Sequence, residues 1–182
     1  MKRRTAQEIL ADSFREIAAV KSINKITIQE IVDNCGYSPA TFYRNFKDKY
    51  DLIAWEHTRD VAEIMDRTGK QDDPWKQTLL DGARRFDAEK AYLANLFQHT
   101  SGHDSFVRYM VDINQNALKN HILSVCGKSD LDKKEELYLR IYCLGTVNLT
   151  CEWILGRFDA SPEEIAEVYE RSLPEPLQKY LF

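Results

Sequence analysis

The sequence contains few of the residues that build tight turns, with 7 glycines and 5 prolines among 182 residues. An all-β sandwich or barrel needs many short turns rich in these residues, so the composition argues against that class. No apolar run approaches the roughly 18 residues that would span a membrane. Apolar residues still make up 43% of the chain, which is enough for a hydrophobic core and too many for a disordered chain.

The chain also lacks the usual cysteine signatures. Its four cysteines form no C-x-x-C pair, which argues against a zinc ribbon or a thioredoxin-like motif. The amino-terminal segment is charged and amphipathic where a signal peptide has an apolar core, so we expect a cytoplasmic protein with buried, reduced thiols. Two alternatives stay open: a metal-binding pair formed by His99 and His103, and a redox sensor formed by Cys143 and Cys151.

Neither sign of charge dominates the chain, because 25 Lys and Arg face 29 Asp and Glu for a net charge of −4. This balance argues against a protein that binds nucleic acid over its whole surface. The charges are divided unevenly, however: residues 1–50 hold nine basic and six acidic side chains, and the remaining residues hold 16 and 23. A basic head on an acidic body fits DNA binding by one domain, although random scatter would also produce a difference of this size.

Apolar residues recur at spacings of three and four along the chain, which is the period of an amphipathic helix. We therefore predict an all-α protein. The predicted helices lie at about residues 4–21, 28–34, 39–46, 49–64, 74–86, 92–97, 104–126, 137–155 and 162–173.

Local signals divide residues 27–46 into two short helices joined by a turn. Thr27 and Glu30 form a capping box at the start of the first helix. Gly36 stands where that helix must end, and Ser38 followed by Pro39 begins the second. This spacing predicts a helix-turn-helix, in which the second helix enters the major groove of DNA.

The run ITIQEIVDNCGYSPATFYRNFKDKYDLI resembles the amino-terminal signature of TetR-type bacterial transcriptional regulators. The shared features are the T-x-x-x-I-V pattern, the glycine turn, the F-Y-x-x-F segment and the K-x-x-L start of the fourth helix. The resemblance implies a three-helix helix-turn-helix DNA-binding domain over residues 1–48 and a helical effector-binding and dimerisation domain over residues 49–182. It further implies a homodimer that binds a palindromic operator in double-stranded DNA.

The resemblance and the helix-turn-helix geometry together suggest the DNA contacts. Tyr43 and Lys49 match family residues that bind phosphates, whereas Pro39 and Ala40 lack hydrogen-bonding side chains and would touch only thymine methyl groups. Residues 2–4 form either a basic arm in the minor groove or a frayed terminus. The predicted DNA-binding residues are Thr27, Ser38, Pro39, Ala40, Thr41, Tyr43, Arg44, Asn45 and Lys49.

The run GTVNLTCEWILGRFDASPEEIAEVY resembles the last helices of a TetR subgroup that includes regulators of dihydroxyacetone kinase operons. The resemblance does not identify the effector, because some members respond to a protein partner instead of a small molecule. The family resemblance makes a repressor released by its effector the main hypothesis. Because the effector class is open, an activator or a regulator controlled by a protein partner is the alternative.

The helices at 137–155 and 162–173 are the predicted dimer elements, and Trp153 either anchors that interface or lies in the core of one subunit. Aromatic and apolar side chains of the body are the candidates for an effector pocket, although the same spacing also produces an ordinary core. The sequence shows no nucleophile and base at a recognisable spacing, so we predict no enzymatic activity, no cofactor and no metal. The predicted ligand-binding residues are Trp55, Phe86, Phe97, Tyr109, Met110, Ile113, Tyr142 and Trp153.

Overall fold

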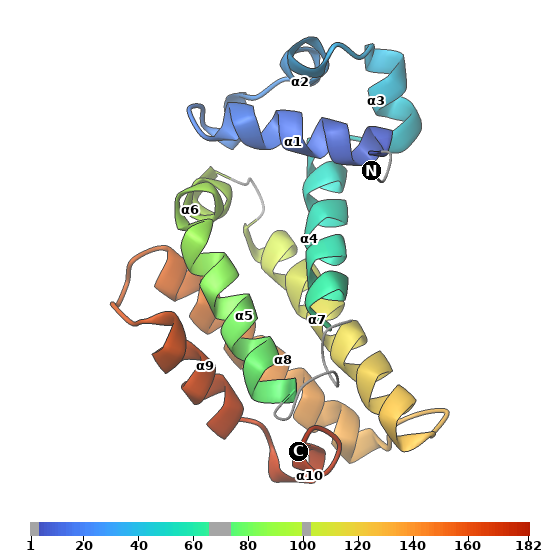
Figure 1. Cartoon of the computed structure of the whole chain (residues 1–182), viewed down its shortest axis with the longest axis vertical. Coiled ribbons are helices and arrows are strands. Elements are labelled where there is room, and N and C mark those ends of the chain that lie inside the picture. Colours follow the sequence, from blue (N-terminus) through green and yellow to red (C-terminus); the bar gives the residue numbers. More distant parts are fainter. Residues whose placement is uncertain (1–3, 66–73, 100–102) are drawn as a thin grey trace.

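The computed structural model describes residues 4–65, 74–99 and 103–182, and these residues form helices without any strand (Figure 1). The predicted all-α class is therefore confirmed. No helix among these residues is long and apolar enough to span a membrane. The elements are α1 (Ala6–Ala18), the 3-10 turn η1 (Ile23–Lys25), α2 (Ile28–Cys35), α3 (Pro39–Asn45), α4 (Lys49–Met65), α5 (Pro74–Ala88), α6 (Lys90–His99), α7 (His103–Cys126), α8 (Lys133–Ile154), α9 (Pro162–Arg171) and α10 (Glu175–Gln178).

Capping boxes define where several of these helices begin. The Thr27 hydroxyl accepts a hydrogen bond from the Glu30 amide at 3.2 Å, and the Glu30 carboxylate accepts one from the Thr27 amide at 2.9 Å. The structure corrects the predicted start of α8, which begins at Lys133 instead of residue 137. The cause is a third capping box in which Asp132 is the N-cap, because such a cap satisfies amides that would otherwise lack partners.

Gly36 ends α2 as the sequence predicts. Its φ of +72° lies in the left-handed region, where a side chain would clash with the backbone and glycine does not. The chain then turns to Ser38, whose hydroxyl accepts a hydrogen bond from the Thr41 amide at 3.2 Å and begins α3. The turn and the cap together fix the angle between α2 and α3.

Helices α1, α2 and α3 form a head at one end of the molecule, and α4 runs from this head into the body (Figure 1). Leu10, Phe14, Ile31 and Phe42 are fully buried in the head. The Ser13 hydroxyl donates to the Ile31 carbonyl at 2.6 Å, which ties α1 to α2. Because α4 is shared by both parts, the domain boundary at 48/49 stays a prediction.

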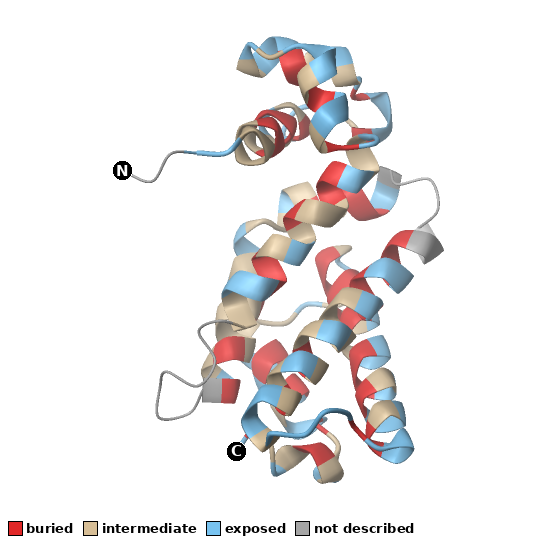
Figure 2. Cartoon of the chain, turned by 90° about the vertical axis from the view of Figure 1, so that its right-hand side faces the viewer, coloured by how far each residue is buried: buried red, intermediate tan, exposed pale blue. Residues whose placement is uncertain are grey.

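In the body, α5 packs against α9 and α7 packs against α8. Buried residues lie along the inward faces of the helices and exposed residues along the outward faces (Figure 2). Trp153 is fully buried, and its indole N–H donates to the Ala160 carbonyl at 2.9 Å. This contact places Trp153 in the core of one subunit, so the interface alternative for this residue is wrong.

A group of charged side chains joins the head to the body. Arg15 of α1 pairs with the buried Glu56 of α4 and also reaches Glu89 at 2.9 Å. The Tyr92 hydroxyl donates to the other Glu56 oxygen at 2.9 Å, and Arg85 pairs with Asp60 at 2.7 Å. We call this group the junction network: Arg15, Glu56, Asp60, Arg85, Glu89 and Tyr92.

Burial raises the pKa of Glu56, and Arg15 and Tyr92 beside it oppose that rise. The charge of Glu56 therefore depends on its partners. Removing one partner of a buried ion pair leaves the other charge without compensation, which costs far more than losing an exposed pair.

We expect Arg15→Met to lower the free energy of unfolding by about 3–5 kcal/mol, because it leaves Glu56 buried and unpaired. Without Arg15 the folded-state pKa of Glu56 lies further above its unfolded value, so the loss shrinks as the pH falls and Glu56 takes up a proton. Urea unfolding at pH 8 and pH 5 measures both effects.

The matched control is Arg84→Met, which removes an exposed ion pair with Glu163 at 2.9 Å. This variant should lose less than about 1 kcal/mol. Equal losses in the two variants would show that the junction network does not support the fold as described.

Candidate nucleic-acid interface and effector cavity

Helix α3 presents most of the predicted DNA-binding residues to solvent. Ser38, Pro39, Ala40, Tyr43 and Arg44 are exposed. On the opposite side of the helix Phe42 is fully buried, and its ring lies 5.8 Å from that of Phe46. Helix α3 is therefore anchored from behind, and its outer surface has the form of a recognition helix.

Several polar side chains of α3 bond to their own helix when no DNA is present. The Arg44 guanidinium donates to the Thr41 hydroxyl at 3.1 Å and to the Ala40 carbonyl at 3.3 Å. The Asn45 side chain, which is half-buried, donates to the Thr41 carbonyl at 2.8 Å. Binding of bases or phosphates by Arg44 and Asn45 would have to replace these local bonds.

Tyr43 is 59% exposed, and its ring packs edge-on against Phe42 with centroids 5.7 Å apart. No hydrogen bond within the described residues engages its hydroxyl. A rigid ring with an available O–H at the edge of α3 is suited to a phosphate contact. The role of Tyr43 at the phosphate stays a prediction.

Lys49 has a structural role that the sequence did not reveal. Its ammonium donates to the carbonyls of Ile23, Asn24 and Ile26 at 2.8, 3.0 and 2.8 Å. An ammonium has three N–H donors, so all of them are used to hold the loop between α1 and α2. The predicted phosphate contact would require Lys49 to give up at least one of these bonds. Thr27 is occupied similarly, because its hydroxyl serves the capping box at the start of α2.

Lys25 and Lys47 are exposed basic residues of the head that lie outside the predicted DNA-binding set. Neither ammonium has an ion-pair partner within the described part of the chain. The only sequence signal for them was the excess of basic residues in the head. Of the predicted arm, Arg4 forms an ion pair with Asp12, while Lys2 and Arg3 lie outside the described residues.

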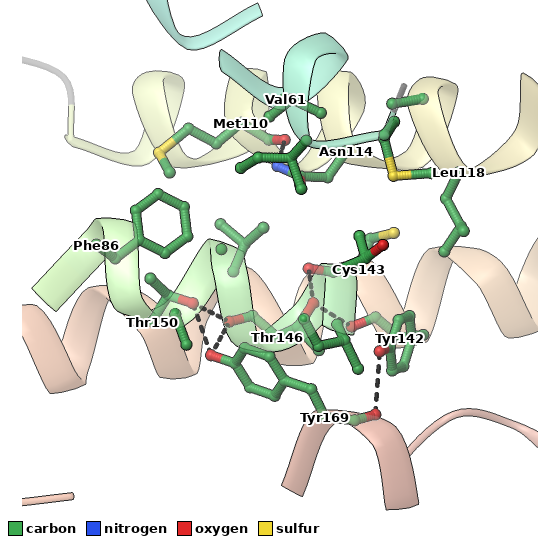
Figure 3. A pocket seen from close by; sticks show the side chains of 18 of the residues that line it. Val61, Phe86, Met110, Asn114, Leu118, Tyr142, Cys143, Thr146, Thr150 and Tyr169 are labelled. Carbon is green, nitrogen blue, oxygen red and sulfur yellow. Dashed lines mark hydrogen bonds between the residues drawn. The ribbon is translucent and has the colours of Figure 1, made fainter. Parts of the chain in front are cut away.

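The body contains a cavity of about 120 Å³ between α4, α5, α7, α8 and α9 (Figure 3). Phe86, Met110 and Tyr142 line it, as predicted. Below them the Tyr169 hydroxyl lies 2.6 Å from that of Thr150 and donates to the Thr146 carbonyl at 2.9 Å. These hydroxyls were missed because isolated polar residues on an apolar helix give little sequence signal.

The other five predicted pocket residues do not line this cavity: Trp55, Phe97, Tyr109, Ile113 and Trp153. Trp55 packs against Phe46 near the head, with centroids 5.7 Å apart. Phe97 packs against Phe106 at 6.2 Å and borders a second cavity of only about 30 Å³. The reason is simple: helical spacing places aromatic side chains on an inward face, and it does not distinguish filled core from cavity wall.

The histidine and cysteine alternatives receive no support. His99 ends α6 and His103 begins α7, so the two do not lie one turn apart on a single helix, and residues 100–102 between them lie outside the described residues. The described residues hold no group of three or more potential metal ligands. Burial raises the pKa of Cys143 and of Cys151 to about 12, which keeps both thiols neutral and unreactive.

An anchored, exposed α3 after a glycine turn, set in a three-helix head, defines the class of helix-turn-helix DNA-binding proteins. Two family comparisons then identify the family. Residues 11–54 match the bacterial regulatory proteins of the tetR family, and residues 73–174 match a transcriptional regulator C-terminal region. The chain belongs to the TetR family of DNA-binding transcriptional regulators.

Among curated relatives, the chain is 23% identical over 91 residues to the HTH-type dhaKLM operon transcriptional activator DhaS of Lactococcus lactis. It is 25% identical over 87 residues to an HTH-type transcriptional regulator of Haemophilus influenzae. These matches cover 50% and 48% of this chain, and they span 48% and 37% of the relatives' own lengths.

The solved structures that are similar share the fold over nearly the whole chain. The dihydroxyacetone kinase operon activator DhaS aligns with a TM-score of 0.64 at 20% identity, over 97% of this chain and 96% of its own. A TetR transcriptional regulator from Rhodococcus sp. RHA1 also gives 0.64, at 17% identity, over 97% and 98%. At these identities the likeness concerns the fold alone.

We expect Lys49→Met to lower the free energy of unfolding by about 1.5–3 kcal/mol, because three carbonyls lose a charged donor. Lys47→Met is the matched control: its side chain is exposed, so its stability should change by less than about 0.5 kcal/mol. Urea unfolding of both variants tests the assignment. A stable Lys49→Met protein that has lost only DNA affinity would instead favour the phosphate role.

Proposed function

We propose that this TetR-family chain acts as a homodimer that binds a palindromic operator, represses transcription and is released by an effector bound in the body. The observation that carries the proposal is the exposed face of α3, with Tyr43 and Arg44 on it, set in the basic head of an otherwise acidic chain. Two such helices, one from each subunit, would enter successive major grooves of the operator.

The proposed DNA contacts divide by chemistry. Tyr43, with Lys25 and Lys47 from the flanking loops, would bind phosphates and set affinity and salt dependence. Arg44 has the guanidinium geometry that pairs with guanine. Pro39 and Ala40 stand at the exposed start of α3, where their small apolar surfaces would meet thymine methyl groups.

The proposed dimer surface is an apolar stripe on α8. Leu137 and Ile141 are 61% and 65% exposed, and Leu144 continues the stripe one turn further along. The spacing of four and three residues places them on one face of the helix, whereas Tyr142, Cys143 and Val147 of the same helix face the core. Val168 of α9 adds a further exposed apolar side chain. A second copy of the same surface would cover it in a symmetric dimer.

In the proposed mechanism, helix α4 transmits the effect of a bound effector from the cavity to the head. Val61 and Ile64 of α4 line the cavity, while Glu56 and Asp60 of the same helix belong to the junction network. An effector that favours another position of α4 would therefore move α1 and the head. Once the spacing of the two recognition helices changes, they no longer fit both half-sites together.

An activator is the second candidate, because the relative DhaS is named as a transcriptional activator. A reporter gene placed behind the bound promoter separates the two possibilities. Deletion of the regulator raises expression if it represses and lowers expression if it activates. Co-purification from the native cell tests whether a protein partner takes the place of a small effector.

We expect the purified protein to select fragments of its own genome that contain an inverted repeat, with affinity that falls steeply as salt rises. Tyr43→Phe keeps the ring against Phe42 and removes only the hydroxyl. It should weaken operator binding about two- to tenfold, the effect of losing one hydrogen bond, without changing the unfolding midpoint. Fluorescence anisotropy at several salt concentrations measures both. Salt-insensitive or absent binding would refute the proposal.

We expect Ile141→Glu to convert the dimer into monomers, because it places charges in the centre of the apolar stripe on both subunits. Val20→Glu is the matched control: Val20 is also an exposed apolar residue, at 89%, but it lies after α1 in the head. Sedimentation velocity reports the oligomeric state of each variant. A dimer that tolerates Ile141→Glu would place the interface elsewhere.

A further inference from the structure

Among the described residues, no charged side chain lines the cavity in the body. Its polar groups are hydroxyls, one amide, one thiol and the indole N–H of Trp75, and the hydroxyls of Tyr142, Thr146 and Tyr169 donate to carbonyls of the chain itself. The Asn114 amide donates to the Met110 carbonyl at 2.8 Å. A charged ligand would lose its hydration in this cavity without gaining a counter-charge, which is strongly unfavourable.

Two titratable groups at this wall are also neutral. The His57 ring lies 3.4 Å from the Asn114 amide, and burial together with Arg85 lowers the pKa of His57 to about 4. Burial raises the pKa of the Cys143 thiol to about 12. At neutral pH the surroundings of the cavity therefore offer no charge from either residue.

One donor in the wall lacks a partner. Trp75 of α5 lines the cavity and is only 4% exposed, and among the described residues its indole N–H has no hydrogen-bond partner. A buried donor without a partner is costly and uncommon in folded proteins. The buried Trp153 differs from Trp75, because its indole N–H donates to the Ala160 carbonyl.

The size of the cavity limits the ligand further. An apolar cavity of roughly 150 Å³ binds benzene, and this cavity measures about 120 Å³. A single ring or a short branched hydrocarbon is therefore the largest group that fits without movement of the wall.

From these observations we infer that the effector is a compact, uncharged and largely hydrophobic molecule whose one hydrogen-bond acceptor receives the Trp75 N–H. Carboxylates and phosphate esters are disfavoured by the same physics, because the described wall offers no counter-charge to replace their hydration. The inference rests on the proposed function only in assuming that the occupant of this cavity is the regulatory ligand.

The test uses three probes of six heavy atoms each on the whole chain at pH 8. Pyridine, uncharged at this pH, carries one ring-nitrogen acceptor, benzene has nearly the same shape without one, and butyrate represents the charged class. Isothermal titration calorimetry should show binding of the first two and none of butyrate. Binding of butyrate in the cavity, or failure of both neutral aromatic probes, would overturn the inference.

The variant Trp75→Phe keeps an aromatic ring in the wall and removes the N–H. Its affinity for pyridine should fall about two- to tenfold, the effect of one lost hydrogen bond, while its affinity for benzene stays within about twofold. Equal losses for both probes would show that Trp75 only packs against the ligand and would overturn its role as donor.

A second variant guards against a folding defect in Trp75→Phe. Gly82 lies in the cavity wall, and a Cβ added there would meet the Ile64 Cδ1 at 4.0 Å, an ordinary contact. Gly82→Ala should therefore fold normally and weaken both neutral probes together, because it narrows the cavity. If both bind Gly82→Ala as they bind the wild type, they occupy another site and the inference fails.

Operator binding without any probe separates this inference from the proposed function. A protein that binds its operator but neither aromatic probe retains the DNA-binding function and refutes the ligand class. A protein that binds the probes with the expected response to Trp75→Phe but never binds operator DNA confirms the ligand class and refutes the regulatory role.

Discussion

The buried ion pair between Arg15 and Glu56 is the contact on which the arrangement of head and body depends. It links α1 to α4, and Tyr92 and Glu89 extend it to the α5–α6 region. Such a pair contributes little net stability compared with apolar packing, but it tolerates displacement poorly, because a partly separated pair leaves desolvated charges behind.

The sequence predicted local structure correctly wherever one or two neighbouring residues determine that structure. Thr27 with Glu30, Gly36, and Ser38 with Pro39 each act within four residues of the chain, and the structure shows each of them in the predicted role. The start of α8 was missed because Asp132 stands in a run of charged residues, in which an N-cap residue cannot be told from its neighbours. The roles of Lys49 and Arg15 were not visible at all, since their partners lie 23–26 and 41 residues away.

The two functional regions differed in how far the sequence predicted them. The outer surface of α3 follows from the motif, because a short helix anchored by Phe42 and Phe46 must expose its remaining face. The cavity depends on how five helices pack, and the spacing of residues along the chain does not predict the space left between those helices. Phe86 and Phe97 have similar chemistry and helical context, yet only Phe86 lines the cavity between α4, α5, α7, α8 and α9.

Helix α4 joins these regions through two adjacent faces. Glu56 and Asp60, one turn apart, meet α1 and α5 in the junction network, whereas Val61 and Ile64 meet the cavity. The acidic residues Glu56 and Asp60 therefore lie on the face of α4 next to the face that lines the cavity. In the proposed mechanism, a hydrophobic occupant that displaces Val61 and Ile64 would also shift Glu56 against Arg15. Buried ion pairs tolerate small displacements poorly. A movement of α4 too small to disturb the core would therefore still change the position of α1, and with it the position of the recognition helix α3.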